Sequence, residues 1–258
     1  MTFWINGELK KDSSAIAIND RGFLLGDGLF ETFYVDNGYA CEVDEHLDRL
    51  NQSLNILDIS CPYSKAELKH AIQSCLSANE INFGSLRLTV SRGTGPRGLL
   101  PPNDCHSTTL ITCAKGHIKR NEFPAINLTI SKIRRNETSP TSRLKTIGGY
   151  LDNILALKEA KDAGFDDAIL LNTKDKIACT TSANIFLKID DAWHTPPKED
   201  GILPGIYRDI TIHKLKVEKQ VILEHCLSLS DLDIADKILI SNSLIGLREV
   251  SSVNINKI

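Results

Sequence analysis

The sequence predicts a mixed α and β (α+β) protein built from two lobes. Its 258 residues correspond to one large or two small domains at roughly 100 to 200 residues per domain. Segments with strand-like alternation are interspersed with segments of helical periodicity along the whole chain. Residues 114–124 are polar and lack periodicity. We therefore predict a smaller N-terminal domain over 1–113, an interdomain linker over 114–124 and a larger C-terminal domain over 125–258.

The N-terminal domain opens with a predicted hairpin. Residues 29–35 have the composition of a strand, 36–38 (Asp-Asn-Gly) form a turn that tolerates positive φ, and 39–43 return. A helix capped by Asp44 should follow, because leucines recur on one face after it. This region should therefore form a strand pair followed by an amphipathic helix.

The rest of this domain contains a second helix, a strand and a loop. Ser64 and Glu67 have capping-box spacing, which predicts a helix that runs to about Ala78. In 85–91 apolar residues alternate with polar ones, as in a strand with one buried face. The glycine-rich segment 92–98 that follows is predicted to be a substrate loop, because it lacks the setting of a dinucleotide or P-loop fingerprint.

The C-terminal domain alternates strands and helices. Gly164 is predicted to end a helix in the left-handed conformation, and a proline-glycine turn at Pro204-Gly205 precedes another helix. The predicted strands are 126–131, 168–171 and 184–189, and the predicted helices are 150–163 and a segment from about 206 to 214.

Composition excludes several classes of protein. The chain is 41% hydrophobic and 24% charged with a net charge of -3, which is ordinary for a globular protein and offers no field for nucleic acid or an anionic membrane. Its seven cysteines include no Cys-x-x-Cys pair and its seven histidines no ligand spacing, so we expect no metal site and a reducing compartment. We expect a cytoplasmic protein that neither binds nucleic acid nor crosses a membrane.

Three features could carry chemistry. A helix that starts at Gly205 offers unpaired N–H groups and the positive end of its dipole to an anion such as phosphate, although a plain helix start is an adequate alternative. Lys145, in a polar stretch before a helix, could bind a cofactor covalently or simply be solvated. Arg49 could bind an anion, or pair with Glu45 one turn earlier on an exposed helix face.

Taken in order along nearly the whole chain, seven segments resemble the fold type IV (class IV) pyridoxal phosphate-dependent aminotransferases and their relative 4-amino-4-deoxychorismate lyase. This resemblance implies the D-amino-acid and branched-chain aminotransferase-like fold. The segments are Asp20–Thr32, His46–Leu50, Lys145, Ser182–Phe186, Thr195–Pro196, Ile202–Arg208 and Ser241–Leu244.

The resemblance implies a role for each matching residue. Lys145, in the C-terminal domain, would be the catalytic lysine that forms the Schiff base with pyridoxal 5'-phosphate and then moves a proton. Tyr150 would approach the phenolic oxygen of the cofactor. The phosphate would be held by Arg49, by the backbone of Gly205, Ile206 and Tyr207, and by Ser243. The family usually has threonine where Tyr207 stands, so one hydroxyl contact is in question there.

Cys179 is the main departure from the family pattern. The family has glutamate at this place, five residues before Asn184, to pair with the pyridine nitrogen of the cofactor. A carboxylate keeps that nitrogen protonated and the ring a better electron sink, whereas a thiol does so only weakly unless it ionises. Either the ring stays largely unprotonated, or another acid substitutes, or activity has been lost.

The substrate-side residues favour the lyase, which releases pyruvate and 4-aminobenzoate for folate synthesis. Ser241–Gly246 resembles the corresponding lyase segment, and Leu99 stands where D-amino-acid transaminases have histidine. Arg97 would bind a substrate carboxylate and Asn242 would orient the substrate; Phe30 and Glu31 are further expected substrate contacts. The alternatives are an aminotransferase acting on branched-chain or D-amino acids, and a pyridoxal phosphate-binding protein with weak or lost catalysis. The resemblance also implies an amino-acid-like small-molecule substrate and a homodimer with active sites near the subunit interface.

Overall fold

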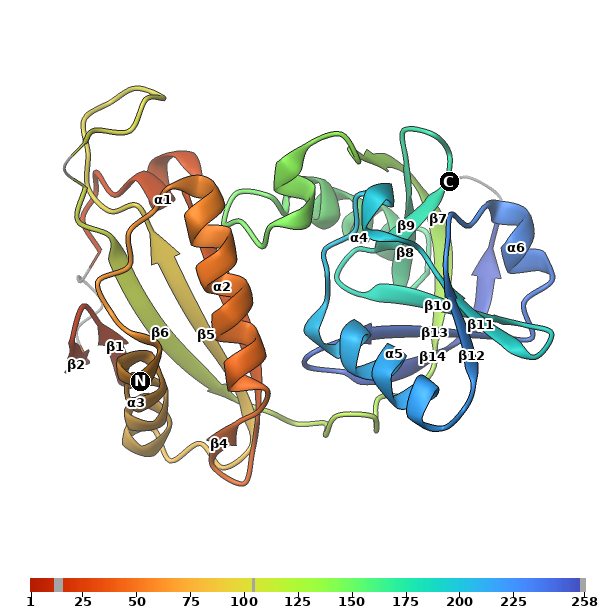
Figure 1. The fold of residues 1–258 in the computed structure, drawn as a ribbon, viewed down its shortest axis with the longest axis horizontal. Coiled ribbons are helices and arrows are strands. Elements are labelled where there is room, and N and C mark those ends of the chain that lie inside the picture. The colour runs from red at the N-terminus through yellow and green to blue at the C-terminus, as the bar shows by residue number, and fades with distance from the viewer. Residues whose placement is uncertain (12–15, 104, 256–258) are drawn as a thin grey trace. The chain divides into compact units, whose positions relative to one another are not determined.

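The computed structural model describes residues 1–11, 16–103 and 105–255, and these divide into two compact units. The first unit comprises Met1–His117 with Lys145–Gly149, and the second comprises Ile118–Leu144 with Tyr150–Ile258. In each unit helices pack on a β-sheet (Figure 1), which confirms the predicted mixed α and β class. In the described part of the chain, no helix is both long and apolar enough to cross a membrane.

The first unit is a six-stranded sheet with two long helices. The strand order is β2-β1-β6-β5-β3-β4, with antiparallel neighbours throughout, and α2 and α3 lie against one face (Figure 1). The elements are β1 (Phe3–Ile5), β2 (Glu8–Lys10), α1 (Arg21–Leu25), β3 (Gly28–Asp36), β4 (Tyr39–Ala40), α2 (Val43–Leu57), α3 (Lys65–Ala78), β5 (Gly84–Ser91) and β6 (Thr108–Lys115).

Alternation along the strands sorts the side chains of this sheet between its two faces. Leu86, Leu88 and Val90 are fully buried, which confirms the predicted one-sided strand. On β3 the buried residues Glu31 and Phe33 share one face, and Phe30 lies on the other, since successive side chains of a strand point in opposite directions. Adjacent residues of β3 therefore contact different groups, on opposite faces of the sheet.

The two helices of the first unit begin differently. The capping box at Ser64 and Glu67 is present as predicted. In α2 the N-cap is Glu42, in the left-handed conformation, and the helix begins at Val43. The prediction that Asp44 caps this helix is therefore wrong. Asp44 lies in the first helical turn, where its carboxylate interacts favourably with the helix dipole and forms ion pairs with Lys65 and Lys69 of α3.

The second unit is an eight-stranded sheet with mixed strand directions. Its order is β12-β11-β10-β13-β14-β7-β8-β9; α4 packs on β7 and β8, and α5 on β12 and β13. The elements are β7 (Ile126–Arg135), α4 (Leu151–Asp162), β8 (Asp167–Asn172), β9 (Ile177–Thr180), β10 (Asn184–Ile189), β11 (Ala192–Thr195), α5 (Ile206–Val217), β12 (Val221–Glu224), α6 (Leu229–Asp233), β13 (Lys237–Asn242) and β14 (Gly246–Asn254), with 3₁₀ turns at Pro140–Arg143 and Lys198–Asp200.

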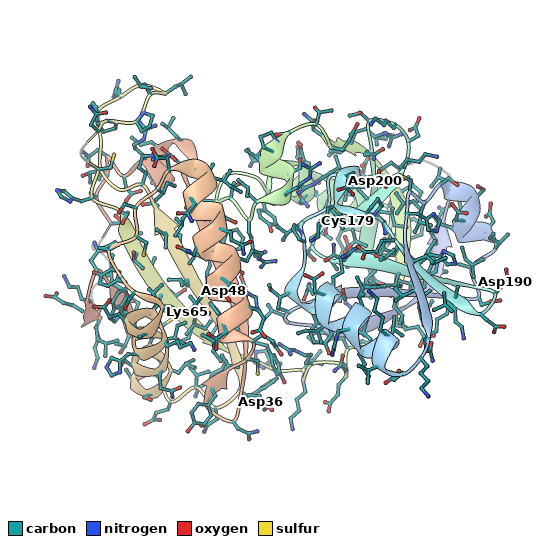
Figure 2. The ribbon with its side chains drawn as sticks, in the orientation of Figure 1. Asp36, Asp48, Lys65, Cys179, Asp190 and Asp200 are labelled. Atoms are coloured by element: carbon teal, nitrogen blue, oxygen red, sulfur yellow. The ribbon has the colours of Figure 1, made fainter. Side chains whose placement is uncertain are left out.

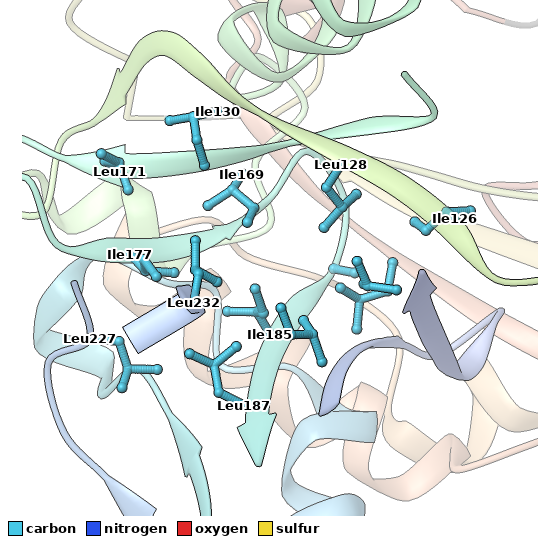
Figure 3. Close-up of a cluster of buried hydrophobic side chains, with 14 residues drawn as sticks. Ile126, Leu128, Ile130, Ile169, Leu171, Ile177, Ile185, Leu187, Leu227 and Leu232 are labelled. Atoms are coloured by element: carbon cyan, nitrogen blue, oxygen red, sulfur yellow. The ribbon is translucent and has the colours of Figure 1, made fainter. Parts of the chain in front are cut away.

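A cluster of buried aliphatic side chains forms the core of this unit (Figure 3). Isoleucine and leucine from β7, β8 and β10 meet residues from α6, β13 and β14 there, and several of them, such as Ile130, Ile169 and Ile185, are completely buried. Branched side chains suit a sheet that is covered on this face. The core gives β10 and β13 a fixed register, Asn184 opposite Ser241, and this register matters for the site.

The course of the chain differs from the predicted division. Strand β6 continues to Lys115, inside the expected linker 114–124, and the unit boundary follows His117. The segment Lys145–Gly149 packs with the first unit, although we expected its lysine in the C-terminal domain. The reason is backbone pairing: this segment adds to the edge of β3, through a bridge between Leu29 and Thr146.

Candidate active site

Lys145 is held on the edge of strand β3. The N–H of Phe30 donates to the carbonyl of Lys145 (2.9 Å), and the N–H of Ile147 donates to the carbonyl of Gly28 (2.9 Å). The Lys145 ammonium nitrogen Nζ lies 4.5 Å from the centroid of the Phe30 ring. The half-buried lysine therefore has a fixed backbone and an aromatic surface beside its amine.

A second cation shares the Phe30 ring. The guanidinium carbon of Arg87, on β5, lies 3.5 Å from the ring centroid, and its Nε donates to Thr89 (3.2 Å). Sequence analysis missed Arg87; its signal was its place among the polar positions that alternate with Leu86, Leu88 and Val90. Together, Phe30, Lys145 and Arg87 form a surface suited to an anionic ligand.

The lysine segment needs glycine where it meets the helix that precedes β3. Gly26 has a left-handed φ of 68°, and a Cβ there would lie 2.7 Å from the Cα of Gly148. Contacts this short are not found for real Cβ atoms. The glycines of Asp20–Thr32 and of Gly148-Gly149 therefore allow the two backbones to approach.

Glu31 points to the opposite side of β3 and binds helix α2. Its Oε1 accepts from Arg49 Nε (2.8 Å), and its Oε2 accepts from Arg49 Nη2 (2.6 Å) and His46 Nδ1 (2.7 Å). Only 2% of the Glu31 side chain is exposed. The expected substrate contact of Glu31 does not fit these surroundings, because both carboxylate oxygens are bound inside the unit.

The charge state of Glu31 follows from these contacts. Burial by itself would raise the pKa of this carboxyl, but the charge of Arg49 and the hydrogen bonds from His46 and Arg49 outweigh it, so the pKa is lowered. Arg49 thus pairs with Glu31 rather than with the exposed Glu45, because a buried carboxylate requires a cationic partner. The pairing leaves the Nη1 side of the guanidinium directed away from Glu31.

The glycine-rich loop after β5 is held near its middle by Arg21. Arg21, whose side chain is almost fully buried, donates to the carbonyls of Gly98 (2.9 Å) and Leu99 (2.8 Å) and to Asp27 (2.8 Å). Burial opposes ionisation of Asp27, but hydrogen bonds from Arg92 and Arg21 and their charges lower its pKa overall. Arg97 lies in the held segment and is exposed, as a residue that captures a carboxylate from solution would be.

In the second unit, helix α5 presents its N-terminus through a tightly packed turn. Gly205 is the N-cap, and an ideal Cβ on it would lie 2.2 Å from Asn184 Oδ1. Asn184 Nδ2 donates to the carbonyl of Leu203 (3.0 Å). The N–H groups of Ile206 and Tyr207 follow in the first turn, where the helix dipole favours an anion.

Two buried polar residues, Thr195 and Arg208, form hydrogen bonds in the segments packed beside this turn. Thr195 donates through Oγ1 to the carbonyl of Ile185 (2.8 Å). Arg208, with 1% of its side chain exposed, donates to the carbonyl of Pro196 (3.0 Å) and to Glu224 (2.6 Å). The Thr195–Pro196 and Ile202–Arg208 segments are therefore parts of one packed support.

Tyr207 directs its hydroxyl away from the α5 N-terminus. The hydroxyl donates to Asn121 Oδ1 (3.3 Å), and the Arg120 guanidinium lies over the ring at 4.9 Å. The backbone N–H of Tyr207 lies in the first turn of α5 as expected, while its phenol hydroxyl is bound to Asn121.

Ser243 lies in the turn between β13 and β14, beside the α5 support. Asn242 Oδ1 accepts from the N–H groups of Leu244 and Ile245 (2.9 Å each), and its Nδ2 donates to the carbonyl of Ser182 (3.2 Å). These bonds give Asn242 a structural role in shaping the turn, and its expected substrate contact stays a prediction. Because Ser182 and Asn184 are close in sequence, their segment joins the Ser243 turn to the turn before α5.

Cys179 is a buried thiol on strand β9, opposite Leu170 (Figure 2). Its side chain packs with Ala178 and Ile202. Burial raises the pKa of this thiol, the charge of Asp167 adds to the rise, and Arg135 opposes it only in part. Cys179 is therefore a neutral S–H group.

Tyr150 is the half-buried N-cap residue of α4.

Within the described residues, no group of three or more His, Cys, Asp or Glu side chains could hold a metal ion. The donors of the second unit are instead those that suit an anion: backbone N–H groups at the start of α5 and the Ser243 hydroxyl. In the first unit, the Arg49 guanidinium is a further group of this kind.

Comparisons with known proteins agree with these features. The family model "Amino-transferase class IV" matches residues 28–253. A candidate branched-chain-amino-acid aminotransferase of Methanocaldococcus jannaschii is 32% identical, over 94% of this chain and 84% of its own. A D-alanine aminotransferase of Listeria monocytogenes is 29% identical over 98% and 88%. An aminodeoxychorismate lyase of Bacillus subtilis is 30% identical over 83% and 73%.

Solved structures show the same fold. That of a candidate 4-amino-4-deoxychorismate lyase of Legionella pneumophila aligns with a TM-score of 0.88 at 31% identity, covering 95% of this chain and 89% of the other. That of the branched-chain aminotransferase of Escherichia coli aligns with a TM-score of 0.91 at 24% identity, covering 98% and 85%. Enzymes of this family use pyridoxal phosphate and have the fold type IV architecture. The chain belongs to the class IV aminotransferase family.

Proposed function

We propose that the protein is a pyridoxal phosphate-dependent lyase that converts 4-amino-4-deoxychorismate to 4-aminobenzoate and pyruvate, a reaction of folate synthesis. The resemblance of Ser241–Gly246 and of the loop after β5 to the lyase segments supports this reaction. The 31% identity to the Legionella pneumophila candidate lyase supports it further.

The observation that carries the proposal is the pair of cations at Phe30. Lys145 Nζ and the Arg87 guanidinium both lie within 4.5 Å of the ring centroid. The proposed substrate has two carboxylates, and Arg87 and Arg97 offer two guanidinium groups to bind them. The side chain of a branched-chain amino acid has no charge to match the second guanidinium, so the two arginines favour the dicarboxylate.

The residues present fit the phosphate end of the cofactor. The N–H groups of Ile206 and Tyr207, the Ser243 hydroxyl and the Arg49 guanidinium are all donors to phosphate oxygens. Gly205 leaves no Cβ between Asn184 and the helix start. Cys179 fits the pyridine nitrogen only as a weak S–H donor, since its thiol stays neutral. We propose that the ring nitrogen therefore stays largely unprotonated.

When bound, the cofactor supplies an electron sink for the substrate carbon that bears the amine. Lys145 Nζ then has two tasks: it removes the proton from that carbon, and it returns a proton to the methylene carbon of the departing enolpyruvyl group. The ether bond to the ring breaks as the ring becomes aromatic, so substrate atoms alone account for both products. Arg87 and Arg97 hold the carboxylates during this step.

An aminotransferase acting on branched-chain or D-amino acids is the second candidate. The identities to the Methanocaldococcus jannaschii and Listeria monocytogenes relatives favour it to a similar degree. A pyridoxal phosphate-binding protein with weak or lost catalysis is the third candidate, and the thiol of Cys179 is the reason to consider it. A transaminase would move the amino group to a keto acid, which the lyase reaction does not do.

The test has two stages. First, purified protein is incubated with pyridoxal phosphate, reduced with borohydride and mapped by peptide mass spectrometry; we expect the adduct on Lys145. Second, 4-amino-4-deoxychorismate is supplied, and pyruvate and 4-aminobenzoate are measured in equal amounts, with L-leucine or D-alanine plus 2-oxoglutarate as the competing assay. Amino transfer without pyruvate release would refute the lyase. An adduct on another lysine would refute the assignment of Lys145.

We also propose a homodimer. Large apolar side chains are exposed on the first unit at Ile18, Phe23, Leu99 and Leu100, and such residues gather at subunit interfaces. Light scattering coupled to size exclusion would report twice the chain mass; a monomer at micromolar concentration would refute the proposal.

A further inference from the structure

We infer that Arg21 is a positioning residue for substrate binding: it fixes the glycine-rich loop on both sides of Arg97, so that the Arg97 guanidinium meets a substrate carboxylate from a backbone that is already ordered. This inference rests on the proposed contact between Arg97 and a carboxylate of the substrate. Arg21 acts through the loop, because only 3% of its own side chain is exposed.

The side chain of Arg21 holds the backbone that follows Arg97. Nη1 donates to the carbonyl of Gly98 (2.9 Å), and Nη2 donates to the carbonyl of Leu99 (2.8 Å). A guanidinium presents its N–H groups in one plane, so bonds to two successive carbonyls fix the orientation of that segment as well as its position. The chain is therefore held from the residue directly after Arg97.

The backbone of Arg21 and its neighbour holds the chain that precedes Arg97. The N–H of Arg21 donates to the carbonyl of Gly93 (2.8 Å). Asp20 and Thr94 form an antiparallel β-bridge beside this bond. The same short segment of the first unit therefore binds the loop before Arg97 and after it.

Two residues of the loop lie between these held parts. The N–H of Gly95 donates to the carbonyl of Asn19 (3.3 Å), so the chain is bound up to Gly95 and again from Gly98. The residues between them are Pro96 and Arg97, and the ring of Pro96 fixes its own φ. The backbone at Arg97 is thus confined, while the Arg97 side chain is exposed.

An ion-pair cluster holds the Arg21 guanidinium itself. Its Nε donates to Asp27 Oδ2 (2.8 Å), and Arg92 Nε donates to the same oxygen (2.8 Å). Burial by itself would raise the pKa of Asp27, but hydrogen bonds from Arg92 and Arg21 and the charges of both lower it overall. Asp27 directly precedes β3, the strand that pairs with the Lys145 segment. The Arg97 loop is therefore fixed relative to that strand.

Position and charge are two different contributions that Arg21 could make to binding, and lysine distinguishes them. Arg21 carries a positive charge that attracts a carboxylate from a distance, and lysine keeps that charge. The single ammonium nitrogen of lysine does not reproduce the planar set of donors that reaches Asp27 and two carbonyls. Arg21→Lys should therefore keep substrate affinity if charge matters and lose it if position matters.

The experiment measures the dissociation constant of 4-amino-4-deoxychorismate on protein that has been loaded with pyridoxal phosphate and reduced with borohydride, which stops turnover. The variants are Arg21→Lys, Arg21→Met and Arg97→Leu. Arg248→Lys and Arg248→Met are the matched controls, since Arg248 of β14 also donates to a backbone carbonyl, that of Pro124 (2.6 Å), in the second unit. Gly95→Ala keeps every charge and crowds the Arg21 side chain, because the new Cβ would lie 3.1 Å from Arg21 Cδ.

The expected loss follows from the backbone order that Arg21 supplies. Ordering one residue of backbone on binding corresponds to roughly a 5- to 30-fold loss of affinity. We expect Arg21→Lys and Arg21→Met to weaken substrate binding by that factor, Gly95→Ala to weaken it less, and both Arg248 variants to equal wild type. In turnover the loss should appear in KM rather than in kcat. The affinity for pyridoxal phosphate should not change, and an equal loss of cofactor affinity would overturn the inference in favour of a general structural role.

Two failures can be told apart. If wild type does not bind 4-amino-4-deoxychorismate, or if Arg97→Leu binds it as wild type does, the proposed contact of Arg97 is wrong. If Arg97→Leu loses affinity while Arg21→Lys keeps it, the positioning inference is overturned and the proposed function stands. Melting temperatures identify variants that do not fold. If both Arg21 variants fail to fold, Gly95→Ala decides, and wild-type affinity in that variant overturns the inference.

Discussion

Replacement of Gly205 by alanine should loosen the turn that we propose to bind the cofactor phosphate, through a single steric contact. The backbone of Gly205 has φ −74° and ψ 134°, a region open to every L-residue, so conformation alone does not oppose alanine. The new Cβ would lie 2.2 Å from Asn184 Oδ1, whereas real Cβ contacts essentially never fall below 3.0 Å. Asn184 must therefore move by most of an ångström.

The displacement breaks the bond from Asn184 Nδ2 to the carbonyl of Leu203. Loss of a buried hydrogen bond costs about 1–3 kcal/mol, which corresponds to roughly a 5- to 150-fold change in an equilibrium constant. If the whole cost falls on the turn before α5, pyridoxal phosphate should bind more weakly by that factor. A fluorescence titration of the ligand-free protein measures this affinity.

A double variant tests the reasoning. Asn184→Ala removes the atom that the Cβ would strike, so Gly205→Ala should add little further loss in that background. If Gly205→Ala weakens binding by the same factor with and without Asn184, the clash is not the cause. If Gly205→Ala alone binds the cofactor as wild type does, the close approach has no functional weight.

Three further predictions use other parts of the chain. The pKa of Glu31 is lowered in the fold. The stabilisation from its ionised form should therefore be present above its unfolded pKa of about 4.5 and be lost as the pH falls through the lower folded pKa. The melting temperatures of wild type and Glu31→Gln should converge in acid, and a constant difference between them from pH 7 to 3 would contradict this. Arg21→Leu frees the two carbonyls that follow Arg97, so trypsin should cut there roughly 5 to 100 times faster; an unchanged rate would show that the loop is held by other contacts. Cys179→Glu should raise turnover of 4-amino-4-deoxychorismate and Cys179→Ser should not, as initial rates of pyruvate release will show; equal rates in all three proteins would mean that this position does not tune the ring.

Features that depend on a few neighbouring residues could be predicted from the sequence. The capping box at Ser64, the alternation from Leu86 to Val90 and the left-handed Gly164 all appear as expected. Each depends on the backbone within a few residues, and residue type alone carries that information.

Features that depend on distant partners could not be predicted in this way. Helical spacing offered Glu45 to Arg49, but the carboxylate that binds it is Glu31, buried on a strand that precedes the helix. The motif around Asn242 suggested a substrate contact, and the turn itself uses the side chain. Motif matching selects residue types along the chain, whereas the partner of each polar group depends on packing between distant segments.

The pairing of Lys145–Gly149 with β3 has a consequence for synthesis on the ribosome. The first unit is not one continuous stretch of sequence, because Ile118–Leu144 of the second unit is made between its strands and its last segment. Domains tend to fold as they emerge, N-terminal first. Here the nascent sheet carries an unpaired edge at β3 until residue 149 has left the exit tunnel. The segment Lys145–Gly149 therefore completes the first unit only after synthesis of the second unit has begun.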